Sequence, residues 1–484
     1  MLIPLAAVLL AVGIAAQDPP STWSRFRGPN GTGIADVEGL PTRFGRADDG
    51  SWENLVWRTP LPPGHSSPVL SADAVFVTAE RDTALLTICV DRATGAVRWQ
   101  REAPRDRVTK VDGRNHPASP SPVVAATGDG ELRVVTFFAD SGLHCYDAIG
   151  ELQWRVPLGP FDNVYGMGAS PIVAGEAVIL ACDQNLDSHV LAVSLADGEL
   201  LWKTARPHAL SGHCTPVMRT DSEHGPEILL PGSFRIDAYD PADGRSRWWF
   251  GGLSFEMKSV PLLHGDVVYV NGYGSPFNQP GQTVALADFA AVLASDDANG
   301  DGAMQPDEIQ EPKAKMFFEF CDLDHDGSLT ASEWSVLQNS LASQNGMLAI
   351  RPGGAGELPA DALLWDYRRS VPQLPSPLIY DDVLYMLNDQ GGILVAFRPK
   401  TGEVLERGRL ADAVDSYYAS PVAGDGKVYF TSLSGIVTVL PAGGSFEPLA
   451  TNRLGETCYA TPALAPGRLF VRTVDALMAF GDGE

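Results

Sequence analysis

Two twelve-residue segments carry oxygen-bearing side chains at the same spacing. Loop 1 runs from Asp297 to Glu308, and loop 2 runs from Asp322 to Glu333. In both loops, Asp or Asn occupies positions 1, 3 and 5, Gly occupies position 6 and Glu occupies position 12. A flexible cage of hard oxygen ligands suits Ca²⁺ better than zinc or copper. The spacing therefore predicts two calcium sites, with ligands from Asp297, Asn299, Asp301, Ala303, Gln305, Glu308, Asp322, Asp324, Asp326, Ser328, Thr330 and Glu333.

Both loops resemble the calcium-binding loop of EF-hands at each diagnostic position. Apolar Met304 and Leu329 at position 8 would allow the two loops to pair through a short β contact. Residues 291–340 contain 7 Asp and 4 Glu against 2 Lys, a net charge of −9. Such a density of like charge repels itself, and bound cations would relieve the repulsion. The alternative interpretation is an acidic loop that is only solvated.

The segment between the loops is short for a pair of EF-hands. Only residues 309–321 separate them, and Pro312 is placed to open a single helix over 312–321. We therefore expect ion binding without a wide, sensor-like opening of helices. Loop 2 has three Asp and Thr330, so it should bind more tightly than loop 1, which has Asn299 and Gln305.

The rest of the chain consists of a repeat that must position these loops. A turn Gly is followed four residues later by Trp at Trp99, Trp154, Trp202 and Trp248. Each unit starts with Ser/Thr-Pro and apolar residues, and most starts are about 45 residues apart. The interval between Pro261 and Pro377 is longer and contains both loops. The eight starts end at Pro68, Pro122, Pro171, Pro216, Pro261, Pro377, Pro421 and Pro462.

A unit of this length, with alternating apolar residues and tight turns, has the size of a four-stranded propeller blade. One such sheet cannot bury both faces alone, whereas eight around an axis can. We predict an all-β, eight-bladed β-propeller over residues 57–484 with a small α-helical EF-hand insertion at 282–346 in the fifth blade. The strand around Trp57 should complete the last blade and close the ring. Residues 17–56 form an N-terminal extension.

The repeat also accounts for the cysteines and tryptophans. The six cysteines form no C-x-x-C pair, and Cys89 and Cys145 fall in a repeat position that Ala occupies in other units. We interpret them as small apolar groups buried between blades rather than as disulfides. The tryptophans are interpreted as packing between blades rather than as stacking platforms for a ligand.

The first sixteen residues are almost wholly apolar and end in Ala15-Ala16. This run is short for a membrane span and predicts a signal peptide at 1–16, hence export to the periplasm or the extracellular space. A buried first strand and a membrane tether are the alternatives, and the run contains no Lys or Arg. No other segment approaches the length of a membrane span. A net charge of −25, from 60 Asp and Glu against 35 Lys and Arg, argues against binding to nucleic acid or anionic lipid.

The D-x-x-T-G-x-x-x-W phrase at Asp91 to Trp99 resembles the repeat of pyrroloquinoline quinone (PQQ) propellers and of BamB-like outer-membrane assembly propellers. The opening W-S-R-F-R-G-P-N-G-T-G at Trp23 resembles secreted BamB-like proteins of planctomycete-type bacteria, some with EF-hand insertions. The resemblance implies an eight-bladed PQQ-like propeller. The PQQ alcohol dehydrogenases carry adjacent cysteines and a Glu/Asn/Asp calcium site in the funnel. This chain has no adjacent cysteines, which argues against a quinone cofactor.

Polar and aromatic residues precede the inner strands and should meet at one mouth of the central channel. Asn115, Met167 and Tyr418 lie in the same connections as three of the candidates given below. Three histidines there could bind a metal or act as a base, and the alternative is a solvated rim. The candidate ligand-binding residues are His65, His116, Tyr165, His213, Lys258, Tyr417 and Tyr459.

No nucleophile, phosphate-binding or zinc-protease motif occurs, and no catalytic residue is assigned. The sequence favours a non-catalytic, calcium-binding propeller that binds or scaffolds a protein or polysaccharide partner at the channel mouth. The alternative function is an enzyme at that mouth, either a periplasmic PQQ-dependent oxidoreductase or a hydrolase.

Overall fold

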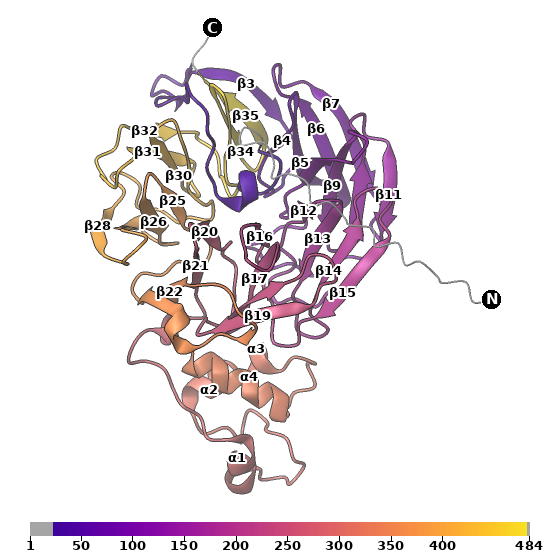
Figure 1. Cartoon of the computed structure of the whole chain (residues 1–484), viewed down its shortest axis with the longest axis vertical. Helices are drawn as coiled ribbons and strands as arrows, with labels where there is room; N and C mark the ends of the chain where they lie inside the picture. Colours follow the sequence, from indigo (N-terminus) through magenta and orange to yellow (C-terminus); the bar gives the residue numbers. More distant parts are fainter. Residues whose placement is uncertain (1–22, 482–484) are drawn as a thin grey trace, which may run out of the picture.

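The computed structural model describes residues 23–481, so the predicted signal peptide lies outside the described residues. Eight sheets of strands are arranged in a ring around a central axis, as Figure 1 shows. The first strands of neighbouring blades contact each other around this axis. The predicted all-β, eight-bladed propeller is confirmed. None of the helices within 23–481 has both the length and the apolar character that crossing a membrane requires.

Each blade is an antiparallel sheet whose inner strands are buried. The strands of the first four blades are β4 (Val69–Leu70), β5 (Ala74–Arg81), β6 (Ala84–Asp91) and β7 (Val97–Ala103); β8 (Val123–Ala126), β9 (Leu132–Phe138), β10 (Gly142–Tyr146) and β11 (Leu152–Val156); β12 (Ile172–Ala174), β13 (Ala177–Cys182), β14 (His189–Ser194) and β15 (Leu200–Ala205); β16 (Val217–Arg219), β17 (Glu227–Gly232), β18 (Arg235–Tyr239) and β19 (Ser246–Gly251). Those of the last four are β20 (Leu262–His264), β21 (Val267–Gly272), β22 (Gly346–Ile350) and β24 (Leu363–Tyr367); β25 (Leu378–Tyr380), β26 (Val383–Leu387), β27 (Ile393–Phe397) and β28 (Val404–Arg409); β29 (Val422–Gly424), β30 (Lys427–Thr431), β31 (Ile436–Pro441) and β32 (Ala450–Arg453); β33 (Ala463–Ala465), β34 (Arg468–Arg472), β35 (Ala476–Phe480) and β3 (Leu55–Pro60).

The ring is closed by strands from opposite ends of the chain. Strand β3 pairs antiparallel with β35, and Arg58 lies opposite Met478. This pairing completes the last blade and was predicted from the position of Trp57. Closure leaves no gap between the first and last blades, where an unpaired strand edge would favour aggregation.

The tryptophans join each blade to the next. A Cβ added to Gly95 would lie 2.6 Å from the ring of Trp57, so only glycine allows the ring to lie so close. The Nε1 of Trp57 also donates a hydrogen bond to the carbonyl of Arg92 at 3.1 Å. The prediction that the tryptophans pack between blades is confirmed for Trp99, Trp154 and Trp202. The same contact recurs for Trp99 with Gly150, Trp154 with Gly198, Trp202 with Gly244 and Trp365 with Gly402.

Trp248 departs from this arrangement. Its Nε1 donates to the Glu227 carboxylate of its own blade at 3.1 Å. The connection from β22 to β24 contains β23 (Gly356–Glu357) and a 3-10 helix, η3 (Ala360–Ala362), in place of the usual tight turn. Strand β23 pairs in parallel with β19 and adds a fifth strand to the fourth blade. The six cysteines are all free and buried, and they include Cys89 and Cys145, for which the repeat pattern predicted burial between blades.

The Ser/Thr-Pro starts form a belt of hydrogen bonds around the axis, which we call the hydroxyl belt. In most blades the backbone N–H of this Ser or Thr donates to the hydroxyl of its counterpart in the next blade at about 3 Å. In the fifth blade the position is Val260, which has no hydroxyl to accept from Thr215. The donor–acceptor pairs are Ser67 to Ser121, Ser121 to Ser170, Ser170 to Thr215, Val260 to Ser376, Ser376 to Ser420, Ser420 to Thr461 and Thr461 to Ser67.

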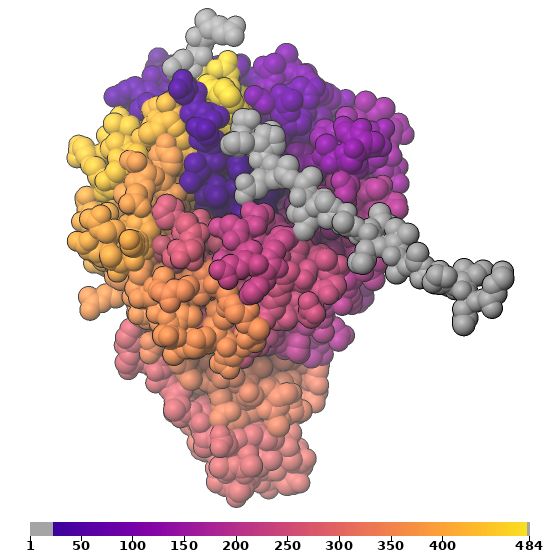
Figure 2. All heavy atoms as spheres, viewed as in Figure 1, coloured from indigo at the N-terminus to yellow at the C-terminus, as the bar shows by residue number. Residues whose placement is uncertain are grey.

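Residues 23–44 of the N-terminal extension cross the centre of the ring and touch blades on several sides (Figures 1 and 2). Leu70 of the first blade donates to the carbonyl of Trp23, and Ala35 donates to the carbonyl of Ala423 in the seventh. Arg27 is fully buried, and its guanidinium donates only to backbone carbonyls, including Pro377 at 2.7 Å. The extension also contains η1 (Pro29–Gly31), β1 (Gly45–Arg46) and β2 (Trp52–Glu53).

The α-helices lie between β21 and β22 and project from the ring (Figure 1). The prediction of a single helix over 312–321 is wrong in one respect. Residues 312–321 form two short helices, because the helix breaks at Phe317, whose ψ is 3°. Apolar residues including Met304, Leu329 and Trp334 form a separate core for this insertion. The helices in the connection from β21 to β22 are η2 (Pro276–Asn278), α1 (Phe289–Asp296), α2 (Pro312–Met316), α3 (Phe318–Cys321) and α4 (Ala331–Ala342).

The tryptophan–glycine contact makes a prediction about stability. Gly150→Ala should place a Cβ 2.7 Å from the ring of Trp99, whereas Gly443→Ala meets nothing within 4 Å. Both glycines have a positive φ, 81° and 89°, so both variants share the backbone strain. We expect Gly150→Ala to lower the free energy of unfolding by about 1–3 kcal/mol more than Gly443→Ala does. Urea unfolding of both variants measures this difference, and equal losses would contradict the packing role.

Candidate functional site

Loop 2 folds so that its carboxylates face one another. Oxygen atoms of Asp322, Asp324 and Glu333 lie within 4.8 Å of one another. Glu333 reaches back across the loop, where Oε1 accepts from the backbone of Leu323 at 2.8 Å and Oε2 accepts from that of Thr330 at 2.9 Å. A position-12 glutamate that offers both oxygens at the centre of the loop has the arrangement a bidentate cation ligand requires.

Loop 1 has the same backbone course with fewer carboxylates together. Glu308 accepts from Ala298 at 2.9 Å and from Gln305 at 3.0 Å, so it also folds across its loop. The Asn299 amide donates to Asp301 at 3.0 Å and to Gln305 at 2.9 Å. Within residues 23–481, loop 2 is the only place where three His, Cys, Asp or Glu side chains bring their ligand atoms this close together. The two loops therefore differ in the number of convergent charges.

The two loops pair with each other as predicted. Met304 and Leu329 form an antiparallel β-bridge, with backbone N–H···O distances of 3.1 and 2.9 Å. Position 6 is Gly302 in loop 1 and Gly327 in loop 2, with φ of 82° and 86°, a left-handed conformation that glycine adopts without strain.

Loop 2 is also seated on the propeller. Leu323 is buried against Leu210 and Phe255, which belong to the connections before the fourth and fifth blades. The Nε2 of His325 lies 3.2 Å from the Asp162 carboxylate in the connection before the third blade. A change in the geometry of loop 2 would therefore reach connections that lead toward the channel.

A pocket of about 210 Å³ lies at one end of the central channel, with Phe26 of the N-terminal segment among the residues that line it. It contains five of the seven residues predicted for the channel mouth. His116 is not part of the lining and lies behind His65, with ring centroids 5.0 Å apart. Those that line the pocket are His65, Tyr165, His213, Lys258 and Tyr459.

The prediction for Tyr417 is wrong. Its side chain is 1% exposed, and its hydroxyl donates to the carbonyl of Ala413 at 2.8 Å in the core of the sixth and seventh blades. The next residue, Tyr418, lines the pocket instead. The sequence had placed both tyrosines in the right connection but could not decide which side chain pointed inward.

Aromatic rings form one wall of the pocket. Tyr459 stacks on His65 with ring centroids 3.8 Å apart, and Tyr418 meets Tyr459 edge to face at 4.9 Å. Across from them, the Lys258 ammonium lies 4.8 Å and the Arg114 guanidinium 5.0 Å from the ring centroid of Tyr165. The pocket thus combines flat apolar faces with cations held over an aromatic ring.

Two pocket histidines are neutral at physiological pH. Burial lowers the pKa of His65 to about 3, and the charges of His116 and Arg472 add to this effect. Burial, with the charge of Lys258, lowers the pKa of His213 to about 3. Within the described chain these histidines form no group close enough to hold a metal ion. The geometry does not assemble the three-histidine metal site considered from the sequence.

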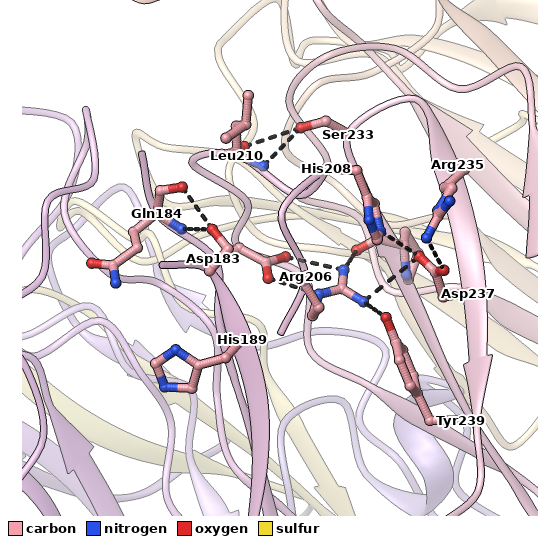
Figure 3. A network of polar contacts seen from close by, with 12 residues as sticks. Asp183, Gln184, His189, Arg206, His208, Leu210, Ser233, Arg235, Asp237 and Tyr239 are labelled. Carbon is pink, nitrogen blue, oxygen red and sulfur yellow. Dashed lines mark hydrogen bonds and ion pairs between the residues drawn. The ribbon is translucent and has the colours of Figure 1, made fainter. Parts of the chain in front are cut away.

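A buried ionic network holds the connection that carries His213 (Figure 3). Arg206 donates to both oxygens of Asp183, at 2.8 and 3.2 Å, and to the hydroxyl of Tyr239 at 2.6 Å. Asp237 accepts from His208 at 2.8 Å. Because these charges are paired out of water, breaking one pair leaves the other charge buried and uncompensated. The network therefore anchors the start of the connection before the fourth blade.

The lining does not fit a calcium-bound quinone. No Asp, Glu or Cys is among the residues that line the pocket, so it supplies neither the carboxylates nor the adjacent cysteines of the quinone dehydrogenases. Several lining residues were not predicted from the sequence. Arg114 lies in a loop without a repeat signature, and Gln373 precedes the sixth blade. Hydroxyl-belt residues also line the pocket, and the sequence analysis interpreted them only as blade starts. The recurrence of Ser or Thr before Pro in successive blades was the signal that could have indicated a ring of hydroxyls.

The histidines predict a pH dependence of stability. An unfolded histidine titrates near pH 6.5, whereas folded His213 has a depressed pKa of about 3, so acid favours the unfolded state. The free energy of unfolding should fall as pH drops below about 6.5, and His213→Gln should reduce this fall between about pH 6.5 and 5. Urea unfolding over this range measures the slope. Exposed His224→Gln is the control, and equal slopes for wild type and His213→Gln would contradict the assignment.

Comparison with known proteins places the fold in context. No curated protein matches the chain. Among solved structures, the chain is similar to BamB from Moraxella catarrhalis, with 13% identity over 88% of this chain and 100% of that one at a TM-score of 0.51. It is also similar to a europium-containing methanol dehydrogenase, with 12% identity over 95% and 91% at 0.52, and to the computationally designed Ika8 protein, with 9% identity over 89% and 100% at 0.53. Identities this low establish the fold alone.

The match to a protein family extends further than a shared fold. The family model described as outer membrane protein assembly factor BamB matches residues 46–209, 88–251 and 232–480. These ranges overlap and together span nearly all of the ring, including the blade that carries the helical insertion. The chain belongs to the family of the outer membrane protein assembly factor BamB.

Proposed function

We propose that this protein is an exported, calcium-binding propeller of the BamB family that binds or scaffolds a partner without catalysing a reaction. Calcium is held by loops 1 and 2 as a pair of EF-hands inserted in the fifth blade. The partner, a protein or a polysaccharide, binds at the pocket end of the channel.

One observation carries the calcium assignment. Glu333 at position 12 lies with both oxygens toward the loop centre, and its carboxylate converges with those of Asp322 and Asp324. Three carboxylates held this close repel one another, and a divalent cation compensates them. Loop 1, with Asn299 at position 3 and Gln305 at position 9, is the weaker site.

Family and composition support the other parts of the proposal. The family match and the apolar residues 1–16 support export to the periplasm or the extracellular space. The opening motif at Trp23 resembles that of planctomycete-type BamB-like proteins. The pocket has aromatic walls and hydrogen-bond donors, and burial lowers the pKa of both lining histidines, His65 and His213, to about 3. Such weak bases support binding rather than catalysis.

Calcium calorimetry tests this function. The wild type should bind two calcium ions, Glu333→Gln should lose the tighter site and Glu308→Gln the weaker one, because each loses its bidentate ligand. At a Kd of about 10⁻⁴ M and about 1 mM calcium, one site should add about 1.4 kcal/mol to the free energy of unfolding.

Glu319→Gln is the matched control, since Glu319 is exposed on α3 outside both loops. It should retain the wild-type stoichiometry. If Glu308→Gln and Glu333→Gln also retained it, the calcium assignment would be wrong.

A further inference from the structure

The hydroxyl belt leaves unused donors in the pocket. Belt residues Ser67, Ser121, Ser170, Thr215 and Thr461 line the pocket, and each hydroxyl oxygen accepts a backbone N–H from a neighbouring blade. Among residues 23–481, none of these hydroxyls donates its own proton to a protein acceptor. Five O–H groups are therefore free to donate to the oxygens of a ligand.

The charged side chains that line the pocket are cationic. The Lys258 ammonium is 2.5 Å from the Glu256 carboxylate, and the Arg114 guanidinium is 2.7 Å from that of Asp112. Neither carboxylate is among the residues that line the pocket. A single negative charge on a ligand can contact this cationic side without meeting a carboxylate.

Buried arginines near the channel add to these cationic groups. Arg27 follows Phe26 of the pocket and donates to carbonyls alone, and burial lowers its pKa to about 9. Arg472 is also buried, with a hydrogen bond to the carbonyl of Pro62 at 2.5 Å, and burial lowers its pKa to about 10. Both remain charged at neutral pH, so two further cations lie close to the channel of a protein whose net charge is −25.

Size and shape narrow the class of ligand. A cavity of about 210 Å³ is smaller than the ~300–1,000 Å³ of pockets for drug-sized molecules. The aromatic side chains of Tyr459, Tyr418 and Tyr165 line this cavity and can contact the apolar side of a small ring. We propose that this pocket binds the ring of an acidic sugar, a hexuronate, with its carboxylate toward Lys258 and Arg114 and its hydroxyls on the belt.

This inference rests on the proposed binding function and names its ligand. The free sugar acid and the end of an acidic polysaccharide share the same chemistry.

The test is calorimetry of the full chain, in calcium-containing buffer, with D-glucuronate, D-glucose and a trisaccharide that ends in glucuronate. Glucuronate should bind at least about tenfold more tightly than glucose, because only it has a carboxylate for the charge-assisted contacts. Tighter binding of the trisaccharide would assign the polysaccharide end, and equal affinity the free acid.

Variants separate the pocket from the rest of the surface. Lys258→Met should weaken glucuronate binding about tenfold or more while glucose binding changes little. Arg114→Gln should also weaken glucuronate binding. The Arg114 side chain is 62% exposed, so this substitution should leave the protein folded. Lys203→Met, on the exposed face of β15, is the matched control and should bind as the wild type does.

Three results would overturn the inference. The first is no binding of glucuronate, and the second is equal affinity for glucose and glucuronate. The third is that Arg114→Gln and a folded Lys258→Met both bind glucuronate as tightly as the wild type does. Binding of pyrroloquinoline quinone without glucuronate would overturn it as well. Calcium stoichiometry measured on the same sample keeps the proposed function separate. A chain that takes up calcium but no glucuronate loses only this inference.

Discussion

Closure of the ring is the constraint on which the rest of the structure depends. A four-stranded blade cannot bury both faces alone, so each blade is stable only between two neighbours. The pairing of β3 with β35 supplies the missing neighbour at the junction of the chain ends. The hydroxyl belt crosses the same junction, where Thr461 donates to Ser67. Since the pocket is lined by residues from the first blade to the last, it exists only when the circle is complete.

The N-terminal segment turns that circle into a site. An empty axis would be an open channel, but residues 23–44 cross it and place Phe26 in the lining of the pocket. To do so the chain buries Arg27 without a carboxylate partner, an arrangement that its hydrogen bonds to several carbonyls make tolerable. The burial of charge at the centre of the ring thus lies beside the candidate pocket, and costly buried groups often gather at functional positions in proteins.

The insertion is independent in its core and connected in its contacts. Its apolar residues pack among themselves, yet Leu323 and His325 of loop 2 touch the connections before the third, fourth and fifth blades. Those connections carry Tyr165, His213 and Lys258 to the pocket. The Asp183–Arg206 pair stiffens the middle one, so a cation in loop 2 and a ligand in the pocket would act on one shared set of backbone segments.

Much of this protein could be predicted from its sequence, because the repeat carries its own physics. The Gly-to-Trp step, the Ser/Thr-Pro starts and the strand at Trp57 were sufficient for an eight-bladed ring, and loop spacing was sufficient to place the carboxylates of loop 2. Local pattern could not decide which of Tyr417 and Tyr418 faced the axis, nor that α2 ends before Phe317. The path of Arg27 through the ring and the belt with its gap at Val260 depend on contacts between residues hundreds of positions apart. Spacing along the chain determined the strands of the blades and the two acidic loops. Only closure of the ring brought the distant groups together, because a convergent pocket has no periodicity in the sequence to reveal it.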